Sequence, residues 1–450
     1  MRVRGIVQGV GFRPFVYRLA HQHTLAGWVL NAGEGVEIHL EGAEDRMTSF
    51  LRDLRAHAPQ AAAIATIEIE SAEATGLAGF AIRRSEHHGR TTAGISPDLA
   101  VCDRCLVDLA DPFDPRFGYA YINCTDCGPR YSIIQALPYD RPHTTMANWQ
   151  MDASCASEYN DPESRRFHAQ PIACARCGPG YQLRTDLSLV GGDDVVRTAA
   201  ALLRDGKILA IKGIGGYHLV CDARNASAVG ALRERKFRKE KPFAVIVTDL
   251  DAARALAVVS PESAALLTST ARPIVLVPAV LELPGIAPES DVVGLMLPYT
   301  PLQHLLFAAA APGALVMTSG NRSSEPIAFE DDDAIARLEG IADAFLIGER
   351  PIARRVEDSI VRVGALGPTI LRRSRGYAPG AVASLPVERP ILALGADLKN
   401  TIALVVDGQV FASQHIGDLT HYDAFRSFED TIVDLLQMYD VARDELTVVS

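Results

Sequence analysis

A glycine-broken loop near the start of the chain has the residue types that bind a small anion. The stretch GIVQGVGFRPF ends in an arginine and a proline, and Arg13 presents a forked cation. Five residues before it can cradle a phosphate with their backbone N–H groups: Gln8, Gly9, Val10, Gly11 and Phe12. Asn31, in GWVLN, has an amide that can both donate to and accept from a water. The combination predicts acyl-phosphate hydrolysis, with Arg13 and Asn31 as catalytic residues; a helix-capping loop with a surface arginine is the alternative.

Cysteines in the next part of the chain have the spacing of a zinc site. CDRC and CTDC are two C-x-x-C knuckles separated by eighteen residues. They supply four thiolates: Cys102, Cys105, Cys124 and Cys127. This pattern favours a closed, structural zinc site over four unrelated buried thiols.

The cysteine pattern repeats after fifty residues. The second copy supplies three thiolates: Cys155, Cys174 and Cys177. Asp152 stands where the first copy has Cys102. Three possibilities stay open: Asp152 is the fourth ligand, His168 takes that place, or the second site is empty. We expect two zinc ions per chain, the second completed by Asp152, because a carboxylate oxygen is also a zinc ligand.

Residues 190–378 place cations and polar side chains beside the ends of expected strands. The stretch RKFRKEKPFAV places clustered cations before a strand, among them Lys236, Arg238, Lys239 and Lys241. Ser319 and Asn321, in TSGN, directly follow another strand, where open α/β sheets usually bind ligands. Fixed cations there would stabilise charge on phosphate oxygens, whereas a solvated helix face is the alternative. The chain has no Walker-type glycine loop, which excludes a P-loop enzyme.

Residues 388–450 begin a further set of strands. PILALGADLKNTIALVVDGQVFASQHIGDL predicts a strand, a turn and two more strands. Lys399 and Asn400 fit a phosphate-facing turn, or alternatively an ordinary polar hairpin. Asp407 and Gly408 predict a tight hairpin turn. YDAFRSFEDTIVDLLQMYDV then predicts an amphipathic helix, and LTVVS the next strand.

Four segments must therefore position these residues. Residues 1–87 read as strand, helix, strand, strand, helix, strand, which is a ferredoxin-like order. Residues 95–182 form a tandem zinc-binding segment that is too small to be stable without metal. Residues 190–378 form an α/β domain, and residues 388–450 the start of a lobe. The expected fold class is thus multidomain, with α+β and α/β parts.

Composition limits the classes of partner and compartment. The 450 residues are 48% hydrophobic and 22% charged, which is typical of globular domains. A formal net charge of -11 argues against a broad nucleic-acid surface. We see no signal peptide, and the most apolar stretch, Leu305 to Met317, is short and contains Pro312. Clustered cysteines indicate a reducing cytoplasm, so we expect a cytoplasmic protein that binds neither nucleic acid nor membrane.

Two segments resemble known families. GIVQGVGFR followed by GWVLN resembles the acylphosphatase family, which implies that Arg13 binds the phosphate and Asn31 positions the attacking water. Most of residues 190–378 resembles the YrdC/Sua5 family, which makes carbamoyl-type adenylates from ATP with magnesium. That resemblance implies contacts to nucleotide phosphates or to the acyl group by Lys236, Arg238, Ser319 and Asn321, with Ser359 and Arg375 as further candidates.

The order of all four segments resembles the carbamoyltransferase HypF family of hydrogenase maturation. The resemblance implies an acylphosphatase domain, a doubled zinc segment, a YrdC-like domain and the beginning of a Kae1-like lobe of the actin/Hsp70 type. It implies cleavage of carbamoyl phosphate, formation of carbamoyl adenylate, and transfer to the C-terminal cysteine of HypE for the cyanide ligands of nickel–iron hydrogenase. The family's Kae1-like lobe extends past residue 450, so we expect a fragment. A threonylcarbamoyl-adenylate synthase and a zinc-ribbon nucleic-acid module remain the competing hypotheses.

Overall fold

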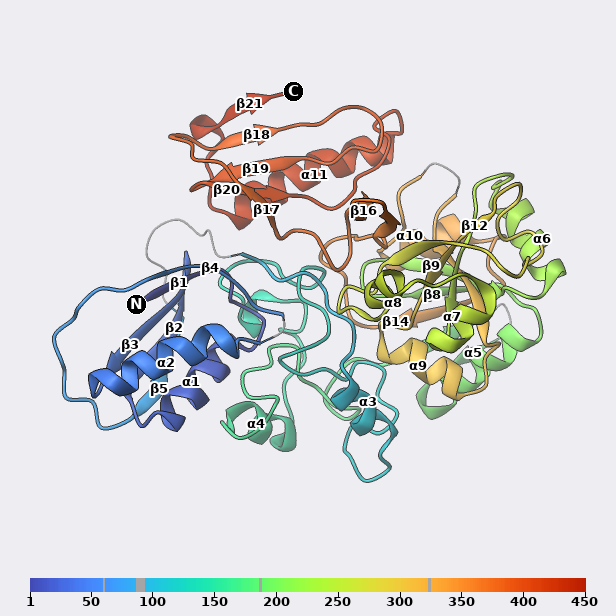
Figure 1. The fold of residues 1–450 in the computed structure, drawn as a ribbon. Helices are drawn as coiled ribbons and strands as arrows, with labels where there is room; N and C mark the ends of the chain where they lie inside the picture. The colour runs from blue at the N-terminus through green and yellow to red at the C-terminus, as the bar shows by residue number, and fades with distance from the viewer. Residues whose placement is uncertain (60, 86–93, 186–187, 323–324) are drawn as a thin grey trace.

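The computed structural model describes residues 1–59, 61–85, 94–185, 188–322 and 325–450 (Figure 1). Three β-sheets follow one another along the chain, and a segment with little regular structure separates the first from the second. In Figure 1 this cyan-to-green segment lies between the blue N-terminal sheet and the larger yellow-green one, with the red C-terminal sheet above them.

The N-terminal sheet has five strands in the order β4-β1-β3-β2-β5. Its elements are β1 (Arg2–Ile6), α1 (Phe12–Gln22), β2 (Ala26–Ala32), β3 (Gly35–Glu41), α2 (Glu44–Ala56), β4 (Ala63–Glu68) and β5 (Phe80–Ile82). Phe12, Val16 and Leu19 on α1 and Phe50 and Leu54 on α2 are at most 5% exposed, as their helical spacing predicts. The ferredoxin-like order is therefore confirmed, and the predicted phosphate loop leads directly into α1.

The cysteine segment shows its duplication as two short helices. These are α3 (Asp103–Ala110) and α4 (Ala153–Asn160), and a 3₁₀ turn, η1 (Arg141–His143), lies between them. Cys102 is the N-cap of α3, and Asp152 is the N-cap of α4. The backbone therefore places these two side chains in equivalent positions of the two copies.

The central sheet has eleven strands in the order β16-β15-β11-β12-β10-β13-β9-β8-β14-β6-β7. Its strands are β6 (Tyr181–Arg184), β7 (Leu189–Val190), β8 (Leu209–Lys212), β9 (Tyr217–Asp222), β10 (Ala244–Val247), β11 (Ile274–Pro278), β12 (Val292–Met296), β13 (Ala314–Ser319), β14 (Ala344–Gly348), β15 (Ile360–Gly364) and β16 (Gly367–Arg372). Its helices are η2 (Gly192–Asp194), α5 (Val195–Arg204), α6 (Ala226–Arg235), α7 (Leu250–Leu256), α8 (Pro261–Thr268), α9 (Pro301–Ala308) and α10 (Asp331–Leu338). Alternate residues of β8 pack into two different apolar cores. Ala210 belongs to the core on one face of the sheet, and Leu209 and Ile211 belong to the core on the other face, so both faces are buried.

Strand directions determine which loops meet at one edge of the central sheet. β8 is parallel to β14 and antiparallel to β9, and β9 is antiparallel to β13. β8, β13 and β14 therefore run in the same direction. The residues that follow Lys212, Ser319 and Gly348 consequently lie at the same edge.

The C-terminal sheet has five strands in the order β17-β20-β19-β18-β21. Its elements are β17 (Ala381–Ser384), β18 (Ile391–Ala393), β19 (Ala403–Val406), β20 (Gln409–Ala412), α11 (Tyr422–Met438), η3 (Arg443–Glu445) and β21 (Thr447–Val449). The predicted turn joins β19 to β20, with φ of 46° at Asp407 and 75° at Gly408. On α11 the helix buries Leu435 and Leu436 as expected, whereas Phe425 is 44% exposed. Among the described residues, we find no helix with both the length and the apolar character to cross a bilayer.

Candidate functional site

The predicted phosphate loop and Asn31 line one small cavity, here called the phosphate pocket. Its lining includes Gly9, Gly11, Phe12, Arg13 and Asn31. Asn31 is on β2 and fully buried, yet neither its amide nitrogen nor its amide oxygen has a hydrogen-bond partner in the structure. Leaving buried polar atoms unpaired costs about 1–3 kcal/mol each. An amide in this state is suited to hold a water molecule or a ligand inside the pocket.

Two glycines let the loop curl tightly around the pocket. Gly9 and Gly11 have φ of 73° and 71°, in the left-handed region that side chains disfavour. A Cβ at Gly11 would lie 2.9 Å from the Cβ of Thr125, and one at Gly9 would lie 3.1 Å from the Tyr139 ring. The loop therefore presents bare backbone to the pocket at the N-terminus of α1, an arrangement that attracts anions.

Arg13 is the loop's cation and is only 8% exposed. Its guanidinium donates to Asp140 Oδ1 at 3.1 Å and to Ser85 Oγ at 3.4 Å. Ser85 in turn donates to the other oxygen of Asp140 at 2.7 Å. Asp140 comes from the cysteine segment, so contacts between two segments orient Arg13. The side-chain amide of Gln8 donates to Ala32 O and Gly35 O, each at 2.8 Å, and so joins the start of the loop to the β2–β3 hairpin.

The cysteine segment closes the phosphate pocket with residues that the sequence analysis does not assign to it; His168 is considered there only as a zinc ligand. Arg130, Tyr139 and His168 line it together with Thr125 and Gln170. Arg130 donates to the carbonyl of Gly9 and to three carbonyls of its own segment, so its charge holds the loop in place. Burial, and then the nearby Arg13 cation, lowers the pKa of His168 to about 4. His168 is therefore a neutral wall of this pocket at neutral pH.

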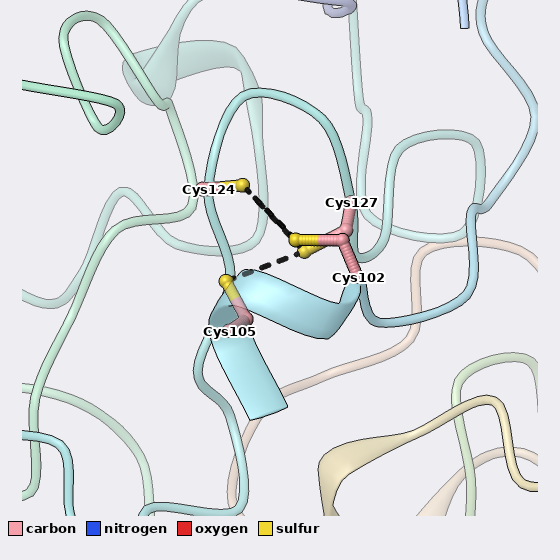
Figure 2. A group of neighbouring side chains, drawn as sticks. All are labelled: Cys102, Cys105, Cys124 and Cys127. Atoms are coloured by element: carbon pink, nitrogen blue, oxygen red, sulfur yellow. Dashed lines mark hydrogen bonds between the residues drawn. The ribbon is translucent and has the colours of Figure 1, made fainter. Parts of the chain in front are cut away.

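The first four cysteines form one compact group (Figure 2). Their sulfurs come from the N-terminus of α3 and from the loop around Cys124 and Cys127, and they point toward one another. The Sγ–Sγ distances are 3.7 Å for Cys102–Cys124, 3.8 Å for Cys124–Cys127 and 3.6 Å for Cys127–Cys105. Zn–S bonds of about 2.3 Å place the sulfurs of a tetrahedral site about 3.8 Å apart. These residues fit a structural zinc ion.

The second copy forms a matching group that contains Asp152. Cys177 Sγ lies 3.7 Å from both Cys174 Sγ and Cys155 Sγ, and Asp152 Oδ2 lies 3.3 Å from Cys174 Sγ. Asp152 Oδ1 also accepts from the backbone N–H of Cys155 at 2.8 Å, which fixes the carboxylate at the start of α4. His168, the alternative ligand, lies outside this group, in the phosphate pocket.

Lys236, Ser319 and Asn321 come together at the edge of the central sheet and are called here the lysine cluster. Lys236 Nζ donates to Ser319 O at 2.6 Å, to Asn321 O at 2.6 Å and to Asn321 Oδ1 at 2.5 Å. Ser319 Oγ donates to Asn321 Oδ1 at 2.8 Å. Burial, and then the nearby Arg238, lowers the pKa of Lys236 to about 7. The three donors of the Lys236 ammonium and the hydroxyl proton of Ser319 are thus used within the cluster, so the cluster offers a phosphate group positive charge rather than a free donor.

Further cations gather near the lysine cluster. Arg233 and Arg238 both lie over the Phe243 ring, with their Cζ atoms 4.5 and 5.3 Å from its centre, while Arg372 pairs with Glu357 at 2.6 Å. Burial, then Arg372 and Arg233, lowers the pKa of Arg238 to about 10. Arg238 donates to the carbonyls of Lys241 and Pro242, at 3.2 and 2.8 Å, while the Lys241 side chain is exposed. Crowded cations favour a polyanionic ligand, because it relieves their mutual repulsion.

Most of the remaining predicted residues have hydrogen-bond or ion-pair partners within the chain. Ser359 is fully buried, donates to Arg375 O at 2.9 Å and accepts from the N–H of Ser374 at 2.8 Å. Arg375 pairs with Asp358 at 2.7 Å and stacks on Tyr299, with its Cζ 3.5 Å from the ring centre. Asn400 donates to the carbonyls of Leu394 and Ala396, and Lys399 is exposed with φ of 51°. Within the described residues, no hydrogen bond or ion pair joins these four residues directly to the lysine cluster.

Comparison with known proteins matches each part of this architecture. Family descriptions match in chain order: Acylphosphatase over 1–82, HypF finger over 101–134 and 153–184, Telomere recombination (Sua5, YciO and YrdC) over 201–374, and HypF Kae1-like domain over 386–449. The carbamoyltransferase HypF of Rhodobacter capsulatus is 46% identical over 445 residues, which are 98% of this chain and 59% of that protein. The chain belongs to the HypF family.

Solved HypF structures have the same fold as this chain. The crystal structure of full-length HypF in its phosphate- and nucleotide-bound form superposes with a TM-score of 0.95 at 41% identity, over 99% of this chain and 59% of that one. The HypF structure from T. kodakarensis gives a TM-score of 0.90 at 40% identity, over 99% and 58%. The chain thus spans about three-fifths of the length of its HypF relatives. The HypF finger and the two cysteine groups together indicate zinc binding.

Proposed function

We propose that this chain hydrolyses carbamoyl phosphate in the phosphate pocket and converts the released carbamate to carbamoyl adenylate, with ATP, at the lysine cluster. We assign the first reaction to residues 1–87 with the wall from residues 95–182, and the second to residues 190–378. The observation that carries the proposal is the unpaired, fully buried amide of Asn31 in the same pocket as Arg13 and the bare backbone loop.

In the first reaction, the loop N–H groups and Arg13 bind the phosphate group of carbamoyl phosphate. Asn31 orients a water whose oxygen attacks phosphorus, while the bond from phosphorus to the acyl oxygen breaks. Carbamate and phosphate leave. The Ser85–Asp140 pair limits the positions that the Arg13 fork can take, so its charge is aligned before substrate arrives.

In the second reaction, a carbamate oxygen attacks the α-phosphorus of ATP and pyrophosphate leaves. Lys236 and the crowded guanidinium groups near Arg238 stabilise the charge on the phosphate oxygens. Magnesium bound with the ATP would supply further positive charge against the phosphate oxygens. The binding of phosphate and a nucleotide by a solved HypF relative supports both sites. In the full-length protein, the carbamoyl group would pass to the C-terminal cysteine of HypE.

The test is pyrophosphate release from ATP that depends on added carbamoyl phosphate. A threonylcarbamoyl-adenylate synthase would instead release pyrophosphate with threonine and bicarbonate, and would have no use for the phosphate pocket. Activity with threonine and bicarbonate, and none with carbamoyl phosphate, would replace the proposal by that alternative.

A further inference from the structure

Arg350 is a buried cation without a counterion. It follows β14 and is 8% exposed. Within the described part of the chain, no hydrogen bond or ion pair joins its guanidinium to another residue; its contact is with an aromatic face, the Cζ lying 4.7 Å from the centre of the Tyr121 ring. Other buried arginines have acceptors within the protein: Arg375 pairs with Asp358, and Arg130 donates to backbone carbonyls. A desolvated guanidinium normally has an anionic partner, because burial of an unpaired charge is costly.

Arg350 lines a small cavity between the cysteine segment and the central sheet, called here the Arg350 cavity. Tyr121, Gly128 and Pro129 form the wall from the cysteine segment, and Gly213 and Tyr299 belong to the wall from the central sheet. In the part of the chain that the structure describes, this lining contains no carboxylate. Aromatic rings and bare backbone surround a single cation, which is an environment that selects a small anion.

The size of the cavity restricts the ligand. Its volume is about 20 Å³, the same as that of the phosphate pocket. A space of this size holds about one water-sized group, so the end of a small anion can enter it and a nucleoside cannot. The segment 128–130 lines both cavities, with Gly128 and Pro129 on one side and Arg130 on the other. Consecutive residues of one segment therefore contribute to both cavities.

The topology also places the Arg350 cavity at the edge of the sheet that carries the lysine cluster. Gly213 follows β8, Ser319 ends β13 and Arg350 follows β14, and these three strands run in the same direction. The turn after β8 returns directly into β9, where His218 pairs with Ser319. A ligand at Arg350 thus lies at the same edge as a ligand at Lys236.

We propose that Arg350 binds the carboxylate-type end of the small planar anion that is activated at the lysine cluster. This inference rests on the proposed function and names its acyl-substrate subsite. The planar fork of Arg350 can hold two oxygens of a carboxylate-type group, and the Tyr121 ring supports the cation from one face. One oxygen of that anion forms the bond to the α-phosphorus of ATP, and the bond from that phosphorus to pyrophosphate breaks. Carbamate and bicarbonate share this chemistry, and the test separates them.

The kinetic test supplies the anion directly, so that the phosphate pocket is bypassed. Pyrophosphate release from MgATP is measured with ammonium carbamate and, separately, with sodium bicarbonate, for the wild type, Arg350→Gln, Arg350→Lys and the control Arg362→Gln. Arg362 is an exposed arginine on β15.

We expect Arg350→Gln to raise the KM for the anion at least tenfold, Arg350→Lys to raise it less, and Arg362→Gln to leave it unchanged. Phosphate release from carbamoyl phosphate should remain at the wild-type rate in all four proteins. The anion that supports turnover identifies the source. An unchanged KM in Arg350→Gln would overturn the inference.

A binding test separates failure of the inference from failure of the proposed function. Sodium bicarbonate is titrated calorimetrically into the same four proteins, without ATP. Binding that is lost in Arg350→Gln and kept in Arg362→Gln supports the subsite, even if no protein releases pyrophosphate. Equal binding by all four, or no binding by the wild type, overturns it. Circular dichroism and zinc content of Arg350→Gln should match the wild type, because no hydrogen bond joins the Arg350 side chain to any other residue that the structure describes.

Discussion

Arg116 and Arg166, fifty residues apart, each reach into the opposite copy of the cysteine repeat. Arg116 donates to Glu158 Oε1 and to Ala173 O, both at 3.1 Å. Arg166 donates to Asp108 and, at 3.2 Å, to Asn123 O. Asp108 and Glu158, and likewise Asn123 and Ala173, are also fifty residues apart. Each copy thus contributes an arginine that binds acceptors in the other copy. Similar arginine contacts across the repeat also reach the cysteines of the two metal groups.

Zinc retention should depend on the arginines that donate to a cysteine sulfur of the opposite copy, Arg116 and Arg165. Arg116 also donates to Cys155 Sγ at 3.2 Å, and Arg165 of the second copy donates to Cys105 Sγ at 3.0 Å. Such contacts orient ligands and offset thiolate charge, and their loss typically weakens metal binding 10–100-fold. Arg116→Lys should speed zinc release from the second site, and Arg165→Ala from the first, by roughly tenfold. Chelator-driven release followed with a colorimetric zinc indicator measures this. Release at wild-type rates in both variants would contradict the cross-repeat role.

The second site should lose its zinc when Asp152 is removed. Its carboxylate belongs to the group of Cys155, Cys174 and Cys177, whereas His168 belongs to the phosphate pocket. Elemental analysis should give two zinc ions per chain for the wild type and His168→Ala, and about one for Asp152→Ala. A Cys variant, Asp152→Cys, should restore two. Loss of one zinc from His168→Ala, with Asp152→Ala unaffected, would assign the fourth ligand to the histidine.

Arg13 should be needed for cleavage of carbamoyl phosphate. Removing a charge-assisted phosphate contact should cost on the order of 3 kcal/mol of transition-state stabilisation, about a hundredfold in rate. Arg13→Ala should therefore release phosphate at about one hundredth of the wild-type rate. Arg46→Ala is the matched control, because Arg46 is an exposed arginine of the same sheet domain. A rate for Arg13→Ala within a factor of three of the control would remove Arg13 from the site.

ATP binding should take up a proton near neutral pH. Burial and Arg238 lower the pKa of Lys236 to about 7, so the free lysine is partly neutral at pH 7 and mostly neutral at pH 8. A bound polyanion favours the charged ammonium and raises that pKa. MgATP affinity should therefore fall as pH rises from 6 to 8. Calorimetry at pH 8 in two buffers of different ionisation enthalpy should detect the uptake.

Lys236→Arg gives the control for this titration, because its guanidinium stays charged over the same range. The variant should show no uptake at this position, and the difference between the two proteins removes the titration of ATP itself. Equal proton uptake by the wild type and Lys236→Arg would show that Lys236 does not face the nucleotide.

Local patterns were sufficient for the parts of the fold and site that lie close together in sequence. The spacing of Phe12, Val16 and Leu19 predicts the buried face of α1, and the fifty-residue repeat puts Asp152 beside the second set of cysteines. Both depend on backbone periodicity or duplication, which a sequence displays directly.

The rest depends on contacts between distant segments. Arg130, Tyr139 and His168 enter the phosphate pocket from more than a hundred residues away, and no local pattern distinguishes them from the other residues of their segment. The sequence also shows that Arg350 and Arg375 are cationic. It does not show that Arg375 pairs with Asp358, whereas Arg350 faces the Tyr121 ring in a cavity. The partner of a buried charge depends on tertiary contacts, which local sequence patterns do not contain.

The central claim is that two separate sites act in series, and one assay of phosphate and pyrophosphate release tests it. With carbamoyl phosphate and MgATP, the wild type should release both products. Arg13→Ala should release both at about one hundredth of the wild-type rate, and added ammonium carbamate should restore its pyrophosphate release. Lys236→Ala should release phosphate at the wild-type rate and no pyrophosphate with either substrate. Loss of phosphate release in Lys236→Ala to the extent seen in Arg13→Ala, or failure of carbamate to rescue Arg13→Ala, would contradict the account.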